Sequence, residues 1–257
     1  MIKCTASIVT YNNSPEIVRK AIESLLHDSP NVEIRVVDNS QTPSLKFSLI
    51  DLPIKYIFVG FNSGYGRGHN RALEECSNSK YHVFINPDIV VAPSTMHALT
   101  AFMDENADIA MVCPKFLHPD GTTQYLIKRY PTVFDLLVRR FFPKSSLPFF
   151  KNRLIRYEMR DAGYASVCDV ESMTGAFMFC RMEVLRKSGG FDPRYFMYFE
   201  DNDLGRKFQG LGYRTVYYPH ASVTHYWERA SHKNIKMLFV FIINGIRYFN
   251  KWGWKFY

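Results

Sequence analysis

Three acidic side chains lie within four positions of one another, directly after a run of aromatic residues. Glu200, Asp201 and Asp203 stand in the segment Gly189–Leu204, behind four aromatic side chains. Apolar surroundings raise the pKa of a carboxyl group, which suits a carboxylate to act as a general base near neutral pH. Acids are also typical of the first turn of a helix, where they complement the helix dipole. The stretch therefore predicts either a catalytic base or a helix start.

Polar residues follow three segments that have the pattern of β-strands. These clusters are Thr10-Tyr11-Asn12, Asp38-Asn39 and Asn86-Pro87-Asp88. A single acidic residue after a strand is usually only a loop or cap residue. In mostly parallel α/β sheets, however, ligands lie beyond the carboxyl ends of the strands. Because all three clusters would lie at that edge, the pattern favours a binding site there.

Glycines alternate in the segment GFNSGYGRGHN, which follows the third predicted strand. Gly64, Gly66 and Gly68 do not have the G-x-G-x-x-G spacing, and the chain has no Walker sequence, so a dehydrogenase or a P-loop enzyme is disfavoured. Glycines before a helix still let backbone N–H groups approach an anion closely. A flexible loop is the alternative. The neighbours that would add to an anion site are Arg67, His69, Asn70 and Arg71.

Strand-like and helical segments alternate along the first half of the chain. Ser14 and Pro15 predict a helix start, followed by apolar residues at helical spacing to about Leu26. Further helices are expected from the glycine loop to about Cys76 and from Pro93. This alternation predicts an α/β fold with a mostly parallel, doubly wound sheet. The expected strands are Ala6–Thr10, Glu33–Val37, Ile54–Val59, Tyr81–Ile85 and Ile109–Cys113.

The second half returns to strands after a turn predicted at His118–Gly121. Gly189-Gly190 is expected to end one helix, and Asp201 or Asn202 to cap the next one, which runs to Gly210. The expected strands are Met173–Cys180, Thr215–Tyr218 and Ser222–Thr224, the last of which leads to His225.

Two segments of the second half combine basic and aromatic residues. The segment Lys128–Arg160 fits an acceptor-binding or membrane-facing insertion, or simply a solvated helical hairpin. On a C-terminal helix from Lys233, polar and basic side chains form one stripe and apolar ones lie opposite, which is typical of a helix at an anionic lipid surface. A helix docked on its own domain or on a second subunit is the alternative. The stripe consists of Lys233, Lys236, Asn244, Arg247 and Lys251.

Composition limits the class of protein further. The 257 residues carry a net charge of +8, which implies an anionic partner such as a nucleotide, a phospholipid surface or nucleic acid. Nucleic acid ranks last because no reader motif is present. The five cysteines show no C-x-x-C pairing, so we expect a reducing compartment with neither a zinc site nor disulfides. Neither a signal peptide nor an apolar run of about 20 residues is seen, so a cytosolic location in contact with a membrane is expected.

Taken together, the sequence resembles the family 2 inverting glycosyltransferases of GT-A fold, and among them the bacterial rhamnosyltransferases of polysaccharide and O-antigen assembly. The matching segments occur in family order over roughly residues 5–228 and are specific for the family only in combination. They are SIVTYNN (Ser7–Asn13), VVDNS (Val36–Ser40), GFNSGYGRGHNRAL (Gly60–Leu73), FINPDI (Phe84–Ile89), TGAFMFCR (Thr174–Arg181), GGFDPRYFMYFEDNDL (Gly189–Leu204) and SVTHYW (Ser222–Trp227).

The resemblance implies a GT-A domain at 1–228, with a nucleotide-sugar half at about 1–116, an acceptor half at about 117–228 and a C-terminal helical extension at 229–257. It implies that Asp201 is the general base, with Gly175, Ala176, Glu200 and Asp203 as acceptor or support residues. Asp38 would accept the imide N–H of the nucleotide base. The further residues implied at the donor site are Thr10, Tyr11, Asn12, Asn39, Gly64, Gly66, Arg67, His69, Asn70 and Asn86.

A divalent cation, Mg²⁺ or Mn²⁺, is also implied at the donor diphosphate. Asp88 matches the last acid of the family's D-x-D motif and His225 its second-half metal ligand, whereas Asn86 replaces the first acid. The implied donor is dTDP-L-rhamnose, with UDP-galactofuranose or a UDP-hexose as alternatives. The implied acceptor is a lipid-linked glycan at the inner face of the cell membrane. A non-catalytic nucleotide-sugar binding protein is the rival reading, and homo-oligomers are compatible with either.

Overall fold

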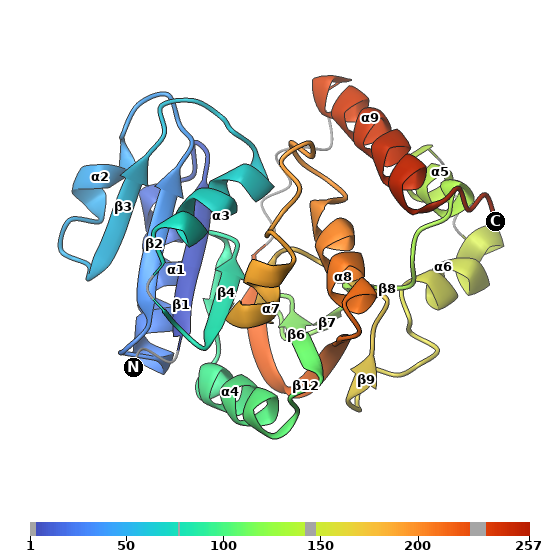
Figure 1. Cartoon of the computed structure of the whole chain (residues 1–257), viewed down its shortest axis with the longest axis horizontal. Coiled ribbons are helices and arrows are strands. Elements are labelled where there is room, and N and C mark those ends of the chain that lie inside the picture. Colours follow the sequence, from blue (N-terminus) through green and yellow to red (C-terminus); the bar gives the residue numbers. More distant parts are fainter. Residues whose placement is uncertain (1–3, 77, 142–147, 227–234) are drawn as a thin grey trace.

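The protein is described from a computed structural model that covers residues 4–76, 78–141, 148–226 and 235–257. Its central sheet has the strand order β3-β2-β1-β4-β11-β6-β12-β5. The strands β1 to β4 are parallel, β11 is antiparallel to both neighbours, and β12 is parallel to β6 (Figure 1). This arrangement confirms the predicted α/β fold with a mostly parallel sheet. The strands are β1 Cys4–Thr10, β2 Glu33–Asp38, β3 Ile54–Phe58, β4 Tyr81–Ile85, β5 Ile89–Val91, β6 Ile109–Leu117, β11 Phe177–Arg181 and β12 Arg214–His225.

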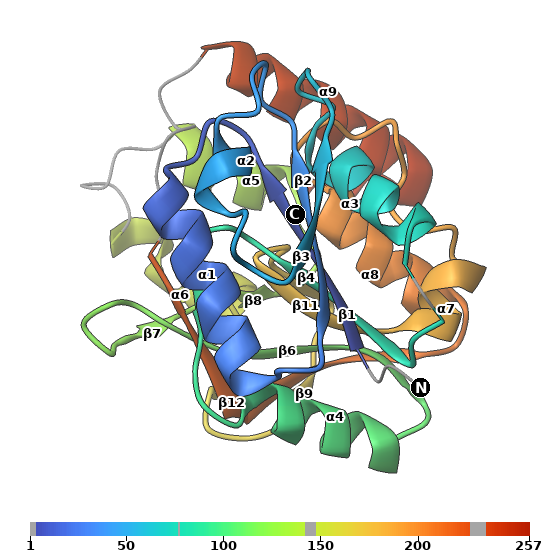
Figure 2. The same cartoon turned by 90° about the vertical axis from the view of Figure 1, so that its left-hand side faces the viewer.

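Helices cover both faces of the sheet. Helix α1 lies on one face, while α3, α7 and α8 lie on the other (Figure 2). At the start of α1, Ser14 Oγ accepts a hydrogen bond from the backbone N–H of Ile17, and Pro15 occupies the first helical position, as predicted. The helices around the sheet are α1 Pro15–Asp28, α2 Leu45–Ser48, α3 Tyr65–Glu74, α4 Thr95–Glu105, α7 Met182–Lys187 and α8 Glu200–Gly210.

Three predicted boundaries differ from the structure. The strand predicted at Met173–Cys180 is divided into β10 (Ser172–Met173) and β11, which belong to different sheets. Helix α8 begins at Glu200, and the residue before it, Phe199, has a left-handed backbone with φ of 68°. Asp201 and Asn202 are therefore not caps, because they already stand in the first helical turn. The two strands predicted around residue 220 form the single strand β12, which has a register shift between Tyr218 and Ser222.

The described part of the segment between β6 and β11 contains short strands and two helices. The predicted turn is present, since Gly121 has φ of 82° and β7 (Thr123–Gln124) pairs antiparallel with β6. Strand β8 (Ile127–Lys128) then pairs with β10 (Ser172–Met173), and β9 (Cys168–Asp169) pairs with β12. The predicted helical hairpin corresponds to α5 (Val133–Phe141) and α6 (Lys151–Tyr157), which gather with α9 beyond α8 (Figure 1).

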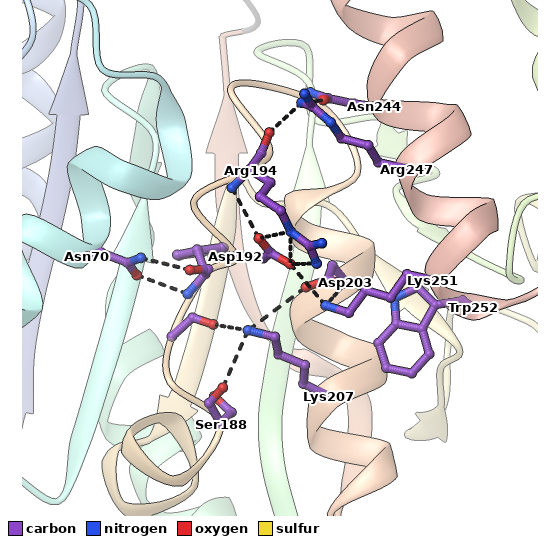
Figure 3. A network of polar contacts seen from close by, with 12 residues as sticks. Asn70, Ser188, Asp192, Arg194, Asp203, Lys207, Asn244, Arg247, Lys251 and Trp252 are labelled. Atoms are coloured by element: carbon purple, nitrogen blue, oxygen red, sulfur yellow. Dashed lines mark hydrogen bonds and ion pairs between the residues drawn. The ribbon is translucent and has the colours of Figure 1, made fainter.

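Helix α9 (Ile235–Trp252) docks on the domain through its polar stripe. Lys251 Nζ contacts Asp203 at 2.7 Å and Asp192 at 3.1 Å, and Trp252 Nε1 donates to Asp203 at 2.8 Å (Figure 3). Asn244 Nδ2 and Arg247 Nη1 donate to backbone carbonyls of the acidic stretch at 2.8 and 2.6 Å. The expectation that this stripe faces lipid is therefore wrong, because buried carboxylates attract it inward; the docked alternative is correct. The predicted start at Lys233 lies outside the described residues.

The outward face of α9 is apolar as a consequence. Five of its side chains are between 41% and 69% exposed and recur at helical spacing. Within the part of the chain that the structure describes, no helix has the length and apolarity needed to cross a membrane. The exposed side chains are Ile235, Phe239, Ile242, Ile243 and Ile246.

Replacement of Lys251 tests the docking of α9. Lys251→Met removes charged hydrogen bonds to Asp192 and Asp203 and is expected to lower the free energy of unfolding by about 1–3 kcal/mol. The melting temperature would fall by about 2–4 °C for each kcal/mol. Lys255→Met, at an exposed position, is the control and should leave the melting temperature unchanged.

The stability lost in Lys251→Met is expected to depend on pH. Arg194, with Lys251 adding to its effect, holds the pKa of Asp192 well below its usual range. A lowered pKa stabilises the fold above the unfolded value of about 3.9 and loses this effect as the pH falls through the folded pKa. The stability difference between wild type and Lys251→Met should therefore be full at pH 7 and narrow below about pH 4. If wild type and Lys251→Met differed in stability by the same amount at pH 7 and below about pH 4, this account would be contradicted.

Candidate active site

The ends of β1, β2 and β4 meet at one edge of the sheet, as predicted. Asn39 N–H donates to the Thr10 carbonyl at 2.9 Å, and Asn39 Nδ2 donates to the Gly64 carbonyl at 3.1 Å. From the end of β4, Asn86 N–H donates to the Ala176 carbonyl at 2.9 Å. Hydrogen bonds at this edge therefore connect the ends of β1 and β2 to each other and to Gly64, and the end of β4 to the segment before β11.

Within this edge, the carboxylate of Asp38 is hydrogen-bonded to neighbouring groups. Its side chain is fully buried, and its oxygens accept hydrogen bonds from Tyr56 Oη, Thr10 Oγ1 and the Ser40 N–H. These three donors use three of about four acceptor positions of a carboxylate, so the contact with an imide N–H stays a prediction. Tyr11 and Asn12 remain exposed at the same edge and are the accessible candidates for nucleotide contacts.

The glycine segment is the start of α3 rather than a flexible loop. Gly64 has φ of 90°, and a Cβ there would lie 2.2 Å from the Phe196 carbonyl oxygen. A Cβ at Gly66 would lie 2.9 Å from Phe191 Cβ. Tyr65 N–H donates to that Phe196 carbonyl at 3.0 Å. The glycines therefore permit close packing of α3 on the acidic stretch, which is a role the sequence did not reveal.

Two polar residues of α3 take part in the same packing, and a third is buried against β1. Asn70 binds both the N–H and the carbonyl of Phe191, at 2.9 and 2.8 Å, and Arg67 Nε donates to the Pro193 carbonyl at 2.7 Å. His69 is fully buried against Ser7, and burial lowers its pKa well below the ordinary value. The predicted positive charge from His69 is therefore corrected, because a neutral buried imidazole cannot supply it.

Asp88 and His225 come together, as the resemblance implied. His225 Nε2 lies 3.4 Å from Asp88 Oδ2, and both side chains are almost fully buried. Gln124 Nε2 donates to the His225 carbonyl at 2.9 Å, so its Oε1 is the atom that accepts from His225 Nδ1 at 3.0 Å. That bond assigns a proton to Nδ1 and fixes the orientation of the ring, with Nε2 toward the carboxylate of Asp88. Gln124 had no signal in the sequence beyond its place in a polar hairpin.

This pair has the donor chemistry of a cation site. An imidazole nitrogen and a carboxylate oxygen are both common metal ligands, and here they lie 3.4 Å apart. No set of three or more His, Cys, Asp or Glu side chains arranged to hold a metal occurs within the described residues. A metal at this pair would therefore take its remaining ligands from bound phosphate oxygens or water.

Asp201 lies in the first turn of α8 with its carboxylate held by three donors. Gly175 N–H donates to Oδ2 at 3.1 Å, and the backbone and side-chain amides of Asn202 donate to Oδ1 at 2.8 Å. Its side chain is partly exposed. Position, accessibility and fixed orientation together suit Asp201 to accept a proton from a ligand.

The adjacent acids have other environments. Glu200 is buried, and burial together with the charge of Asp201 raises its pKa well above the usual range. Asp203 is fully buried and binds Trp252 and Lys251 of α9. Glu200 and Asp203 therefore differ in what they support. Glu200 lies beside Asp201 as a neutral group, and Asp203 binds α9.

Gly175 and Ala176 connect these parts. Gly175 binds Asp201 through its N–H, and its carbonyl accepts a hydrogen bond from Tyr65 Oη. Ala176 binds Asn86 at the end of β4 through its carbonyl. The two residues therefore hold the acid of α8, the start of α3 and the turn before Asp88 in one arrangement.

Comparison with known proteins agrees with this architecture. The family model "Glycosyl transferase family 2" matches residues 5–163, more than half of the chain. The N-acetylglucosaminyl-diphospho-decaprenol L-rhamnosyltransferase of Mycobacterium tuberculosis is 24% identical over 85% of this chain and 74% of its own length. The rhamnosyltransferase WbbL of Escherichia coli is 25% identical over 88% of this chain and 84% of its own length.

Solved structures support the fold alone. A crystal structure of GalNAc-T7 with UDP, GalNAc and Mn²⁺ has a TM-score of 0.65 at 14% identity, over 88% of this chain and 43% of that one. A crystal structure of TarS from S. aureus has a TM-score of 0.58 at 18% identity, over 93% of this chain and 39% of that one. The chain thus spans less than half the length of these two proteins.

Proposed function

We propose that this chain, which belongs to glycosyl transferase family 2, transfers L-rhamnose from dTDP-L-rhamnose to a hydroxyl group of a lipid-linked glycan in cell-surface polysaccharide synthesis. The relatives named as rhamnosyltransferases support the sugar. The observation that carries the proposal is Asp201, an oriented and accessible carboxylate that shares one sheet edge with the Asp88–His225 pair.

The proposed reaction is a single displacement. The acceptor hydroxyl gives its proton to Asp201 as its oxygen forms a bond to the anomeric carbon of the donor sugar. The bond from that carbon to the diphosphate oxygen breaks on the opposite face, and the nucleoside diphosphate leaves with the electron pair. The configuration is inverted, as in inverting glycosidases, and no protein nucleophile is needed.

Replacement of the two neighbouring acids tests this assignment. Asp201→Asn removes the base and is expected to lower turnover about 10²- to 10⁴-fold, the usual contribution of general-base catalysis, with unchanged donor affinity. Glu200→Gln is the matched control, because glutamine reproduces a neutral carboxyl group, and it should keep most of the turnover. Initial rates with saturating donor provide the measurement. Near-normal turnover in Asp201→Asn would exclude Asp201 as the base.

For the donor, we propose that Asp88 and His225 hold a divalent cation, Mg²⁺ or Mn²⁺, against the diphosphate. The single carboxylate and imidazole fit this role because their donor atoms converge and His225 is oriented by Gln124. When bound, the ion would neutralise charge on the diphosphate and so favour its departure. Arg67 and Asn86 remain donor-site candidates at the same edge.

A thermal-shift panel tests the donor and the metal together. A donor that binds only the folded chain at about 100 times its Kd adds about 2.7 kcal/mol, or about 5–10 °C in melting temperature. We expect this shift from dTDP-L-rhamnose and a larger one with Mg²⁺ or Mn²⁺. In His225→Gln the increment due to metal should disappear while the metal-free shift remains.

The other outcomes of this panel are equally definite. A preference for UDP-galactofuranose or a UDP-hexose would keep the family and discard rhamnose. Donor binding with neither transfer nor metal-dependent donor hydrolysis would favour a non-catalytic binding protein. No shift from any donor would contradict the proposed binding site.

We also propose that the protein is peripheral at the inner face of the cell membrane, with the apolar face of α9 in contact with lipid. An amphipathic helix with isoleucine and phenylalanine on one face binds at the membrane interface through buried apolar area. The exposed Trp254 and Phe256 extend this face past the end of the helix. Because the basic residues of the stripe contact the domain instead, we expect binding to depend only weakly on anionic lipid.

Vesicle sedimentation tests the membrane contact. The double variant Phe239→Ser with Ile243→Ser is expected to lose most vesicle binding. Phe47→Ser, at a still more exposed position on α2, should have no effect. Binding should change little between neutral vesicles and vesicles that contain anionic lipid. If the double variant instead kept vesicle binding and altered the oligomeric state, the face would be a contact between copies of this chain.

A further inference from the structure

One lysine of the basic segment lies beside the proposed base. In the β8–β10 ladder Lys128 is paired with Ser172, whose hydroxyl donates to Asn202 Oδ1 at 2.7 Å. Asn202 in turn holds the Asp201 carboxylate. Lys128 is only partly exposed and lies within electrostatic range of Asp201. Its ammonium group therefore adjoins the acceptor side of the site, on the strand pair that leads to Gly175.

A second cation adjoins the first. Arg139 of α5 has its guanidinium carbon 5.4 Å from the ring centroid of Tyr157, and its side chain is exposed. Burial, with the charge of Arg139 as a second cause, lowers the pKa of Lys128 to about 8. Lys128 is therefore still mostly charged at pH 7, at a cost that an anion beside it would offset.

Lys128 and Arg139 differ from three other cations of the segment 128–160 in their ion pairing. Arg129, Arg153 and Arg160 are each within 2.9 Å of a carboxylate oxygen, on Asp161, Asp135 and Glu158. Among the ion pairs of the described residues, none involves Lys128 or Arg139. Two neighbouring cations without a carboxylate partner, next to a catalytic acid, favour the binding of an anionic ligand group.

A buried hydroxyl group adds a donor to the same place. Tyr248 of α9 is 1% exposed, and its hydroxyl has no hydrogen-bond partner in the described part of the chain. It lies within electrostatic range of Asp201 and Tyr157. A buried hydroxyl without a partner is costly, so a ligand oxygen that accepts its proton would remove that cost.

An apolar groove begins on the same helix. Arg139 lies one turn beyond Leu136 on α5, and Leu136 faces α9 across a groove with almost no polar lining. At its inner wall, Phe241 packs on Phe199, directly before the acids of α8, with ring centroids 5.3 Å apart. The groove thus runs between α5 and α9 and reaches Ile242 and Ile246 on the exposed face of α9. It is lined by Val133, Leu136, Leu137, Phe241, Ile242, Gly245, Ile246, Phe249 and Trp254.

We propose that Lys128 and Arg139 bind the phosphate groups of the acceptor, and that the groove between α5 and α9 receives the hydrocarbon chain attached to them. This inference rests on the proposed function. The name of the Mycobacterium tuberculosis relative includes an acceptor of this class, a sugar joined to decaprenol through diphosphate, and the inference assigns the phosphate groups of such an acceptor to Lys128 and Arg139. The cations would hold the phosphate groups and the groove would hold the hydrocarbon chain, so that the acceptor hydroxyl lies at Asp201. The donor diphosphate has its own place at Asp88 and His225, across the site.

Binding of short lipid diphosphates tests the subsite without any sugar transfer. Farnesyl diphosphate in EDTA is expected to raise the melting temperature of the whole chain, whereas farnesol and inorganic pyrophosphate should do so weakly. In Lys128→Met and in Arg139→Gln the affinity for farnesyl diphosphate should fall roughly 10- to 100-fold, as expected for a lost charged hydrogen bond. Lys151→Met, an exposed cation of α6, is the control and should bind as wild type.

Turnover assays separate this inference from the proposed function. With a lipid diphosphate acceptor, both variants should raise the acceptor KM and leave the donor KM unchanged. Unchanged affinity for farnesyl diphosphate in an active enzyme would overturn the inference alone, as would a raised donor KM. Loss of that affinity in variants of a chain that transfers no sugar would support the subsite and refute the proposed function. Arg139→Gln alters an exposed side chain, so its melting temperature should match the wild type.

Discussion

A close backbone contact between the start of α3 and the segment before α8 helps to position Asp201, the proposed base. Helix α3 begins against the segment that leads into α8, and a side chain at Gly64 would overlap the carbonyl of Phe196. With no side chain there, the N–H of Tyr65 reaches that carbonyl, and its hydroxyl reaches Gly175 beside Asp201. Because protein interiors transmit small shifts of packed backbone, we expect this contact to set the distance between α3 and Asp201.

Two adjacent carboxyl groups have different chemistry because α8 turns them to different surroundings. Glu200 points into the interior, where burial and the neighbouring charge favour its neutral form. Asp201 is oriented by backbone and side-chain amides at the surface of the site. A pair of acids whose environments differ in this way can supply one base without mutual repulsion in the ionised state. The third acid, Asp203, is committed to α9.

The sequence predicted the sheet and the helix pattern, because strand ends and helix periodicity are local signals. The meeting of Asp88 with His225 was implied by the family resemblance. The sequence could not predict the direction of the polar stripe of α9, which depends on buried acids some 50 positions earlier in the chain. It also took the glycines and His69 for a phosphate site, since close packing and anion binding both call for small residues. The partner of His225, Gln124, came from a hairpin 101 positions away.

The central claim is that one carboxylate, Asp201, drives a single displacement at the anomeric carbon. The most direct test is the anomeric configuration of the first product formed from dTDP-L-rhamnose and a glycan acceptor, read by NMR of the new linkage. The account predicts a configuration opposite to that of the donor, and the same configuration from Glu200→Gln. A product that retains the donor configuration would require two successive displacements and would contradict the claim.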